Sequence, residues 1–270
     1  MRRSPAPRRS STQRLRLVLA AGVLAGSAAG LAFGQSYLRS VATAAQGNDP
    51  PEAEFHMARL AYQTSGCAGS RGICQPLWAV DYPLAEEHFL PALGRMTRVD
   101  VAGDSRHLPL DGRIFDYPWL FAQQVSQGRW RPSDREIEHL REYLLRGGFL
   151  VFDDFHGEGE WRYFEAIIQR VLPGRAIVDI PDDDMLMNIL FSLDRRTQIP
   201  GDRHLGWRAM EGPPHWRGIY DDDGRLMVAI NHNIDMGDAW EHADDPYYPA
   251  PMTATAYRFG VNYVIYAMTH

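Results

Sequence analysis

Apolar runs alternate with amphipathic segments along most of the chain, and this alternation is typical of an α/β fold. The clearest run, 149–152, consists of four apolar residues between Gly147-Gly148 and Asp153-Asp154. A continuous apolar run predicts a strand of a parallel sheet that is buried on both faces. Related patterns predict strands at 55–62, 98–101, 119–122 and 176–180, and helices at 85–93, at 255–268 and from about 160 to 171.

The helix with the strongest signal begins after Pro132. Ser133 is followed three positions later by Glu136, which completes a capping box, and apolar residues then recur at helical spacing until Gly147-Gly148. Further along, the apolar segments 216–220 and 225–230 flank an Asp-Gly turn that suits a hairpin. The pattern as a whole predicts a Rossmann-like three-layer α/β sandwich with a mainly parallel sheet and a late antiparallel hairpin.

The first 34 residues differ from the rest. Six arginines precede an apolar run rich in Ala, Gly, Val and Leu, and this order predicts a signal peptide over 1–34. The alternative is an uncleaved N-terminal membrane anchor, because the run is about 18 residues long. We therefore expect an exported protein, periplasmic or anchored facing the periplasm, with a linker at 35–53, one α/β domain at 54–270, and membrane contact through the N-terminal segment alone.

Charge and cysteine content narrow the function classes. The chain has no lysine, which excludes P-loop, Schiff-base and lysine-base chemistry. Without residues 1–34, 22 basic residues face 34 acids, a net formal charge of −12 that disfavours nucleic-acid binding. Cys67 and Cys74 are expected to form a disulfide in an oxidising compartment, the alternative being a catalytic thiol.

Chemistry-bearing residues follow the apolar run 149–152. Asp153, Asp154 and His156 are the catalytic candidates, because ligands bind beyond the carboxyl ends of parallel strands and adjacent acids act as general acids or cation ligands. Glu158 and Trp161, a little further on, are candidate ligand-binding residues. The alternative is that the two aspartates cap the next helix or bind loop amides.

A second polar group follows the apolar segment 225–230. Asp235 and Asp238 are candidate ligands of a divalent cation, Mg²⁺ or Ca²⁺, since carboxylate oxygens suit these ions, although the spacing is not that of an EF-hand. An Asx-rich structural turn is the alternative. The candidate ligand-binding residues of this part of the chain are Arg225, Asn231, His232, Trp240 and Glu241.

From residue 55 to 270 the chain resembles the bacterial domain of unknown function family 4159. The segments that carry the resemblance are 78–83 (WAVDYP), 115–118 (FDYP), 140–149 (LREYLLRGGF), 153–158 (DDFHGE), 219–226 (IYDDDGRL), 237–241 (GDAWE) and 260–270 (GVNYVIYAMTH). The resemblance implies a class I glutamine-amidotransferase-like fold. It also implies that 149–152 corresponds to the strand that carries the nucleophilic cysteine in true amidotransferases, where this chain has aspartates. At 183–188, where relatives tend to read Asp-His-Pro-Ile-Phe-His, the chain has DDMLMN and lacks both histidines.

Two functions fit these observations. The first is a non-catalytic envelope module that binds a small polar ligand or an envelope protein partner. The second is a carboxylate- or metal-assisted hydrolase acting on a polar substrate such as a glycan, with Asp153 or Asp154 as nucleophile or base and His156 as proton carrier. Catalysis requires the two polar groups to converge on one face, and we expect that they do.

Overall fold

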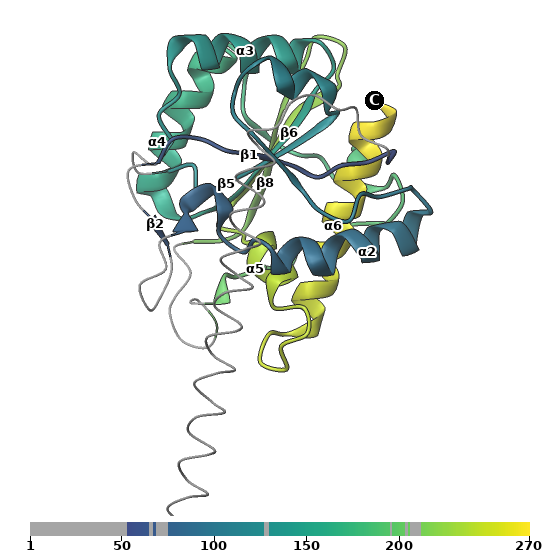
Figure 1. Ribbon diagram of the computed structural model, residues 1–270. Coiled ribbons are helices and arrows are strands. Elements are labelled where there is room, and N and C mark those ends of the chain that lie inside the picture. Colours follow the sequence, from purple (N-terminus) through teal and green to yellow (C-terminus); the bar gives the residue numbers. More distant parts are fainter. Residues whose placement is uncertain are drawn as a thin grey trace, which may run out of the picture. The chain divides into compact units, whose positions relative to one another are not determined.

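A sheet of seven strands forms the centre of the part of the chain that the computed structural model describes, residues 53–64, 67–68, 75–126, 130–194, 196–202, 205 and 212–270 (Figure 1). Five neighbouring strands, β4, β1, β5, β6 and β9, are parallel to one another. Strand β8 is antiparallel to β9, and β7 is antiparallel to β8. The mainly parallel sheet with a late antiparallel hairpin is thus confirmed. The order across the sheet is β4 (Arg106–Leu108), β1 (Ala58–Leu60), β5 (Trp119–Gln123), β6 (Phe149–Phe155), β9 (Leu226–His232), β8 (His215–Tyr220) and β7 (Val178–Asp179).

Helices cover both faces of this sheet, which makes the three layers (Figure 1). On one face lie α3 (Asp134–Leu145) and α4 (Gly157–Val171). On the other lie α2 (Leu84–Thr97), α5 (Met236–Glu241) and α6 (Ala250–Thr269). The short elements are β2 (Cys67–Ala68), β3 (Gln75–Pro76), η1 (Leu77–Ala79), η2 (Gly112–Asp116) and η3 (Met185–Met187).

The continuous apolar runs are explained by burial on both sides of the sheet. Along β6, Phe149 and Val151 belong to the core under α2, α5 and α6, whereas Leu150 and Phe152 belong to the core under α3 and α4. Successive side chains of a strand point to opposite faces, so both sets must be apolar. The predicted strand at 149–152 is confirmed, and it lies in the middle of the sheet, between the two helical layers.

The expected helix start at Ser133 and the hairpin are also confirmed. The Ser133 hydroxyl accepts a hydrogen bond from the backbone N–H of Glu136 (3.3 Å), and the Glu136 carboxylate accepts one from the N–H of Ser133 (2.8 Å). In the hairpin turn, the Asp221 carboxylate accepts the N–H groups of Asp223 and Arg225, and Gly224 takes a φ of 82°. Both boundaries therefore follow local side-chain chemistry that is visible in the sequence.

The expected strand at 98–101 is wrong. Helix α2 does not stop at residue 93 but continues to Thr97, and Arg98 ends it with a left-handed φ of 64°. Val101 makes only an isolated bridge to Phe55, and the edge strand is β4 instead. Only 58–60 of the expected strand 55–62 pairs regularly, and only Val178–Asp179 of the expected strand 176–180.

Three further corrections concern the carboxyl edge of the sheet. Strand β6 does not end before the aspartates but continues to Phe155, since Asp153 still pairs with Gln123. Helix α4 begins directly afterwards, at Gly157 rather than near residue 160. The polar stretch after residue 230 is not one loop, because Asn231 and His232 end β9 and residues 236–241 form α5.

The expected signal segment and nearly all of the expected linker fall on residues 1–52, outside the described residues. Cys67 lies in β2, but Cys74 is also outside them, so the expected disulfide stays a prediction. Within the described residues, no helix has both the length and the apolar character needed to cross a membrane.

Candidate functional site

The carboxyl edge of the parallel sheet concentrates unusual backbone conformations. Four non-glycine residues there have positive φ: Gln124 after β5 (54°), Asp154 near the end of β6 (54°), Asn233 after β9 (61°), and Asp81 before α2 (69°). Such conformations cost free energy in residues with a Cβ, and they cluster at functional sites. The fifth residue of this kind in the described part of the chain is Arg98, whose conformation is explained by the end of α2.

Asp153 joins β6 to the beginning of α5. One of its carboxylate oxygens accepts the Asn231 amide (3.0 Å), and the other accepts the backbone N–H groups of Met236 (2.8 Å) and Gly237 (3.2 Å). Burial, together with the charge of Asp154, raises the pKa of Asp153 to about 7. Both oxygens of this catalytic candidate are occupied by protein donors, and its contacts are those of a structural residue that holds α5 against the sheet.

Asp154 turns away from its neighbour and pairs with His156. Its carboxylate lies 3.2 Å from Nε2 of His156 and also accepts the side-chain amide of Gln124. Burial lowers the pKa of His156, but the hydrogen bond and the charge of Asp154 outweigh this effect, so the pKa ends above its usual value. A partly exposed imidazole beside a buried carboxylate is a pair that can hold a proton or a cation.

Helix α5 brings three more acids to the same place. Asp235 caps the helix by accepting the N–H of Asp238 (2.8 Å), and Asp238 and Glu241 follow on the helix. Burial and the surrounding carboxylates raise the pKa of Asp235 well above its ordinary value and raise those of Asp238 and Glu241. The carboxylates therefore repel one another in an environment with little water.

These acids form overlapping groups whose potential ligand atoms lie within 4.8 Å of one another. One group is Asp154, His156 and Asp235, and it contains residues from both polar segments that the sequence singles out. The expected convergence of these two segments on one face is therefore seen in the structure. The other groups among the described residues are Asp81, Asp235 and Asp238, and Asp238, Glu241 and His242. We call the six residues Asp81, Asp154, His156, Asp235, Asp238 and Glu241 the acidic edge.

Other predicted ligand-binding residues lie beside the acidic edge. Asn231 is buried between Asp153 and the Tyr263 hydroxyl, which donates to its side-chain oxygen (2.7 Å). His232 contacts the carbonyl oxygen of Gly157 through Nε2 (3.1 Å), and burial lowers its pKa to about 4. The hydrogen bonds of these two buried side chains hold the end of β9 in place.

At the start of α4 the surroundings are more open. Trp161 is half-buried, with the guanidinium of Arg217 4.2 Å from its ring centre. Glu158 is exposed and forms an ion pair with Arg162 (3.2 Å) on the same helix. Trp161 is thus the predicted aromatic residue that stays accessible near the strand ends.

Two predicted ligand-binding residues are placed elsewhere, which corrects the expectation for them. Trp240 is buried in the core, where its ring stacks on Phe89, because that side of α5 packs against α2. Arg225 directly precedes β9, at the opposite edge of the sheet. There it pairs with Asp221 (3.1 Å) and donates to the carbonyl oxygen of Leu144 (2.7 Å), so it closes the turn rather than holding an anion at the acidic edge.

Sequence reasoning missed Asp81 and the residues that hold it. Asp81 precedes α2 and is brought to α5 only by tertiary packing, while its side chain accepts the Gln123 amide at the end of β5. The available signal was the segment 78–83, which carries part of the family resemblance but has no ligand spacing of its own.

The comparisons with known proteins agree with the resemblance seen in the sequence. No curated protein matches the chain. A family model matches residues 56–268, which is most of the chain, so the chain belongs to the family described as Domain of unknown function (DUF4159).

Proposed function

We propose that this chain is an exported module of the cell envelope that binds a divalent cation, Mg²⁺ or Ca²⁺, at its acidic edge, and binds a polar ligand or an envelope partner through that cation. The first cation site consists of Asp154, His156 and Asp235. The observation that carries the proposal is the convergence of these three side chains, from two distant segments, to within 4.8 Å of one another.

The donor set suits a hard cation. Carboxylate oxygens predominate at the acidic edge, and Mg²⁺ and Ca²⁺ prefer oxygen ligands. Ligand atoms on opposite sides of a Ca²⁺ ion lie about 4.6–5.2 Å apart, since each is about 2.3–2.6 Å from the ion. The ligand atoms of the three side chains lie within 4.8 Å of one another, which is compatible with ligands of one such ion.

Electrostatics supports the same proposal. Burial of several carboxylates together is unfavourable unless protons or cations neutralise them. Asp235 and Asp238 each have raised pKa values because of burial and the nearby charge of Asp154. A divalent cation would reduce this repulsion, so binding the cation would stabilise the acidic edge.

The fold is proposed to be class I glutamine-amidotransferase-like, as the family resemblance implies, but without thiol chemistry. The end of β6 carries Asp153 and Asp154, and Cys67 lies in the separate two-stranded sheet. An amidotransferase needs an activated thiolate beside a base. The carboxylate-rich strand end fits cation binding instead.

A metal-assisted hydrolase is the second candidate function. It is favoured by His156, whose side chain is 13 % exposed, so that it borders both the acidic edge and the surface. An imidazole with a pKa raised by a buried carboxylate can take a proton from a cation-bound water and return it to a leaving group. In this reaction Asp154 would hold His156 rather than act as the nucleophile, and His156 would be the base instead of a cation ligand, so that the carboxylates of the acidic edge would hold the cation.

Isothermal titration calorimetry tests the proposed function. The full chain is freed of metal with a chelator and titrated with CaCl₂ and MgCl₂ in separate experiments. Wild type should bind at least one of the two ions, and both Asp154→Asn and Asp235→Asn should weaken that binding by tenfold or more. Asp134→Asn is the matched control, because Asp134 is an exposed acid paired with Arg170, and it should bind as wild type does.

Absence of binding to the wild-type chain would overturn the proposal. An equal loss of affinity in Asp134→Asn would also overturn it, since binding would then depend on total charge rather than on the acidic edge. Hydrolase activity is a separate question, which turnover of a model ester by the wild-type chain answers: turnover should require the added cation, and its absence with and without the cation would exclude the hydrolase candidate.

A further inference from the structure

We propose that the acidic edge contains a second divalent-cation site, formed by Asp81, Asp235 and Asp238, which shares Asp235 with the first. This inference rests on the proposed function and extends it from one cation to two. Its geometric basis is that ligand atoms of Asp81, Asp235 and Asp238 also lie within 4.8 Å of one another.

One oxygen of Asp81 points to a ligand independently of the acid cluster. The residue is 4 % exposed, and its Oδ2 accepts the amide of Gln123, but its Oδ1 has no hydrogen-bond partner among the described residues. A buried carboxylate oxygen without a partner loses its hydration with nothing in return. A cation held together with Asp235 and Asp238 would supply the missing interaction.

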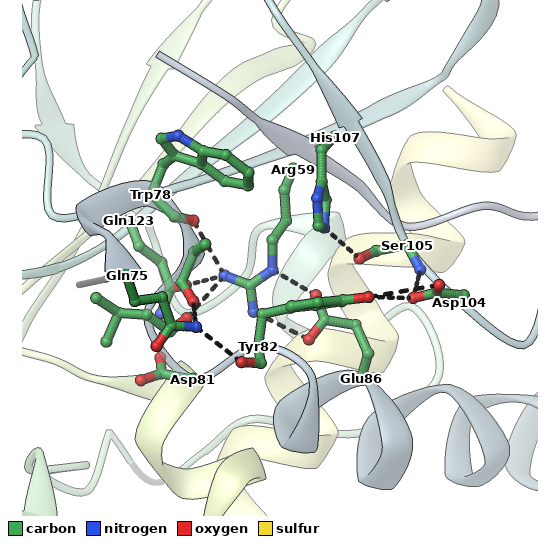
Figure 2. A network of polar contacts seen from close by, with 12 residues as sticks. Arg59, Gln75, Trp78, Asp81, Tyr82, Glu86, Asp104, Ser105, His107 and Gln123 are labelled. Carbon is green, nitrogen blue, oxygen red and sulfur yellow. Dashed lines mark hydrogen bonds and ion pairs between the residues drawn. The ribbon is translucent and has the colours of Figure 1, made fainter. Parts of the chain in front are cut away.

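The neighbouring arginine does not supply that interaction. Figure 2 shows the Arg59 guanidinium between Glu86 and Gln123, and Gln123 in turn reaches Asp81. The positive charge of Arg59 is matched by Glu86, with which it forms a buried ion pair. Its Nη1 also donates to the carbonyl oxygen of Val80 (3.1 Å). Gln123 therefore lies between Arg59 and Asp81, and the ion pair of Arg59 is formed with Glu86.

The side chain of Asp81 lies very close to the first turn of α5. Asp81 itself has a φ of 69°. A Cβ at Gly237, in the first turn of α5, would overlap with Oδ2 of Asp81 and Nε2 of Gln123. A side chain at this position would displace the ends of Asp81 and Gln123, so glycine at residue 237 allows the present close contact between Asp81 and the first turn of α5.

A carboxylate shared by two cations explains why the acids are arranged as they are. Asp235 belongs to both ligand groups, and Asp154 and Asp81 lie in one group each. Removing Asp235 must therefore affect both ions, whereas removing Asp154 or Asp81 must affect one. This pattern is specific to two sites with one common ligand.

The experiment measures stoichiometry and ion proximity with Mn²⁺, which replaces Mg²⁺ or Ca²⁺ at oxygen sites and is paramagnetic. Calorimetric titration of the full chain with MnCl₂ should give two ions for wild type, one for Asp81→Asn, one for Asp154→Asn and none for Asp235→Asn. Electron paramagnetic resonance of the wild type with two equivalents of Mn²⁺ should show a spin-coupled pair. Asp81→Asn should show the spectrum of an isolated ion.

The outcomes separate the two proposals. A single ion in wild type, with an isolated-ion spectrum and unchanged binding by Asp81→Asn, would overturn the second site and leave the first. No ion in wild type would overturn both. The wild-type spectrum decides the matter even where Asp81→Asn fails to fold, because a spin-coupled pair requires two neighbouring ions.

Discussion

Asp153 and Asp154 are adjacent on β6, yet their carboxylates have different partners. Asp153 accepts hydrogen bonds from Asn231, Met236 and Gly237, whereas Asp154, with a φ of 54°, directs its side chain to His156. The strand thus ends in one aspartate that holds the fold and one that faces the acidic edge. This division of roles leads to opposite expectations for the two residues.

Asp153→Asn should destabilise the metal-free chain by about 1–3 kcal/mol, because an amide nitrogen would confront at least one of the buried donors that Asp153 now accepts. Asp154→Asn should have little effect on the stability of the metal-free chain, since asparagine tolerates positive φ well. Urea unfolding in the presence of chelator measures both. Equal destabilisation by the two substitutions would show that the roles are not divided as described.

Asp235→Asn should stabilise the metal-free chain by about 0.5–2 kcal/mol, because it removes a charge from a buried group of like charges and keeps an oxygen that can cap α5. The same substitution should abolish stabilisation by the cation, which in wild type is about 2.7 kcal/mol for one site at a concentration one hundred times the Kd. Thermal unfolding of wild type and of Asp235→Asn, each with and without CaCl₂, measures both effects. If Asp235→Asn is instead less stable than wild type without metal, the acidic edge is structural.

Gly237→Ala should displace Asp81 and Gln123 and destabilise the chain by about 1–3 kcal/mol, as expected for overpacking. It should also reduce the number of bound Mn²⁺ ions. Gly159→Ala in α4 is the matched control, because a Cβ there meets no other atom within 4 Å. The control should be neutral or stabilising by up to about 1 kcal/mol, since alanine is the better helix former. Similar effects of the two substitutions would argue against a tight contact at Gly237.

His107 provides a pH prediction away from the acidic edge. Burial, together with the charge of Arg59, lowers its pKa to about 3, and its Nε2 lies 3.1 Å from the Ser105 hydroxyl (Figure 2). Below pH 6.5 the unfolded chain takes up a proton on this imidazole and the folded chain does not, so stability falls as the pH falls from 6.5 towards 3. Between pH 7 and pH 5 the loss from this residue should be about 2 kcal/mol, at about 1.4 kcal/mol per pH unit below 6.5.

Urea unfolding of wild type and His107→Gln at pH 7 and pH 5 measures this contribution. The variant should lose about 2 kcal/mol less stability than wild type over this interval. An identical loss in the two proteins would mean that His107 takes up its proton in the folded chain as readily as in the unfolded chain.

The sequence predicts the parts of the fold that depend on local chemistry. The apolar run of β6, the Ser133 capping box and the turn at Gly224 are each visible in consecutive residues. The polar side chains of Asp153 and Asp154 hide the true length of β6, although both residues are buried and Asp153 pairs with Gln123 of β5. Polar strand ends are recognisable only when their tertiary partners are known.

The acidic edge was predicted in part for the same reason. Asp154, His156, Asp235 and Asp238 follow apolar strands, so strand-end position identified them. Asp81 precedes a helix and reaches the edge through Gln123 and the space beside Gly237, which no local pattern encodes. Helix α5 was missed because its six residues are too few for a periodic signal, and Asp153, far away in sequence, helps to fix its first turn.

The most direct test of the central claim is anomalous diffraction from crystals of the full chain grown with MnCl₂, collected near the manganese edge. The account predicts an anomalous peak among the side chains of Asp154, His156 and Asp235, and the same peak should be missing in Asp235→Asn. Wild-type crystals grown in saturating MnCl₂ with no anomalous peak at these three residues would contradict it.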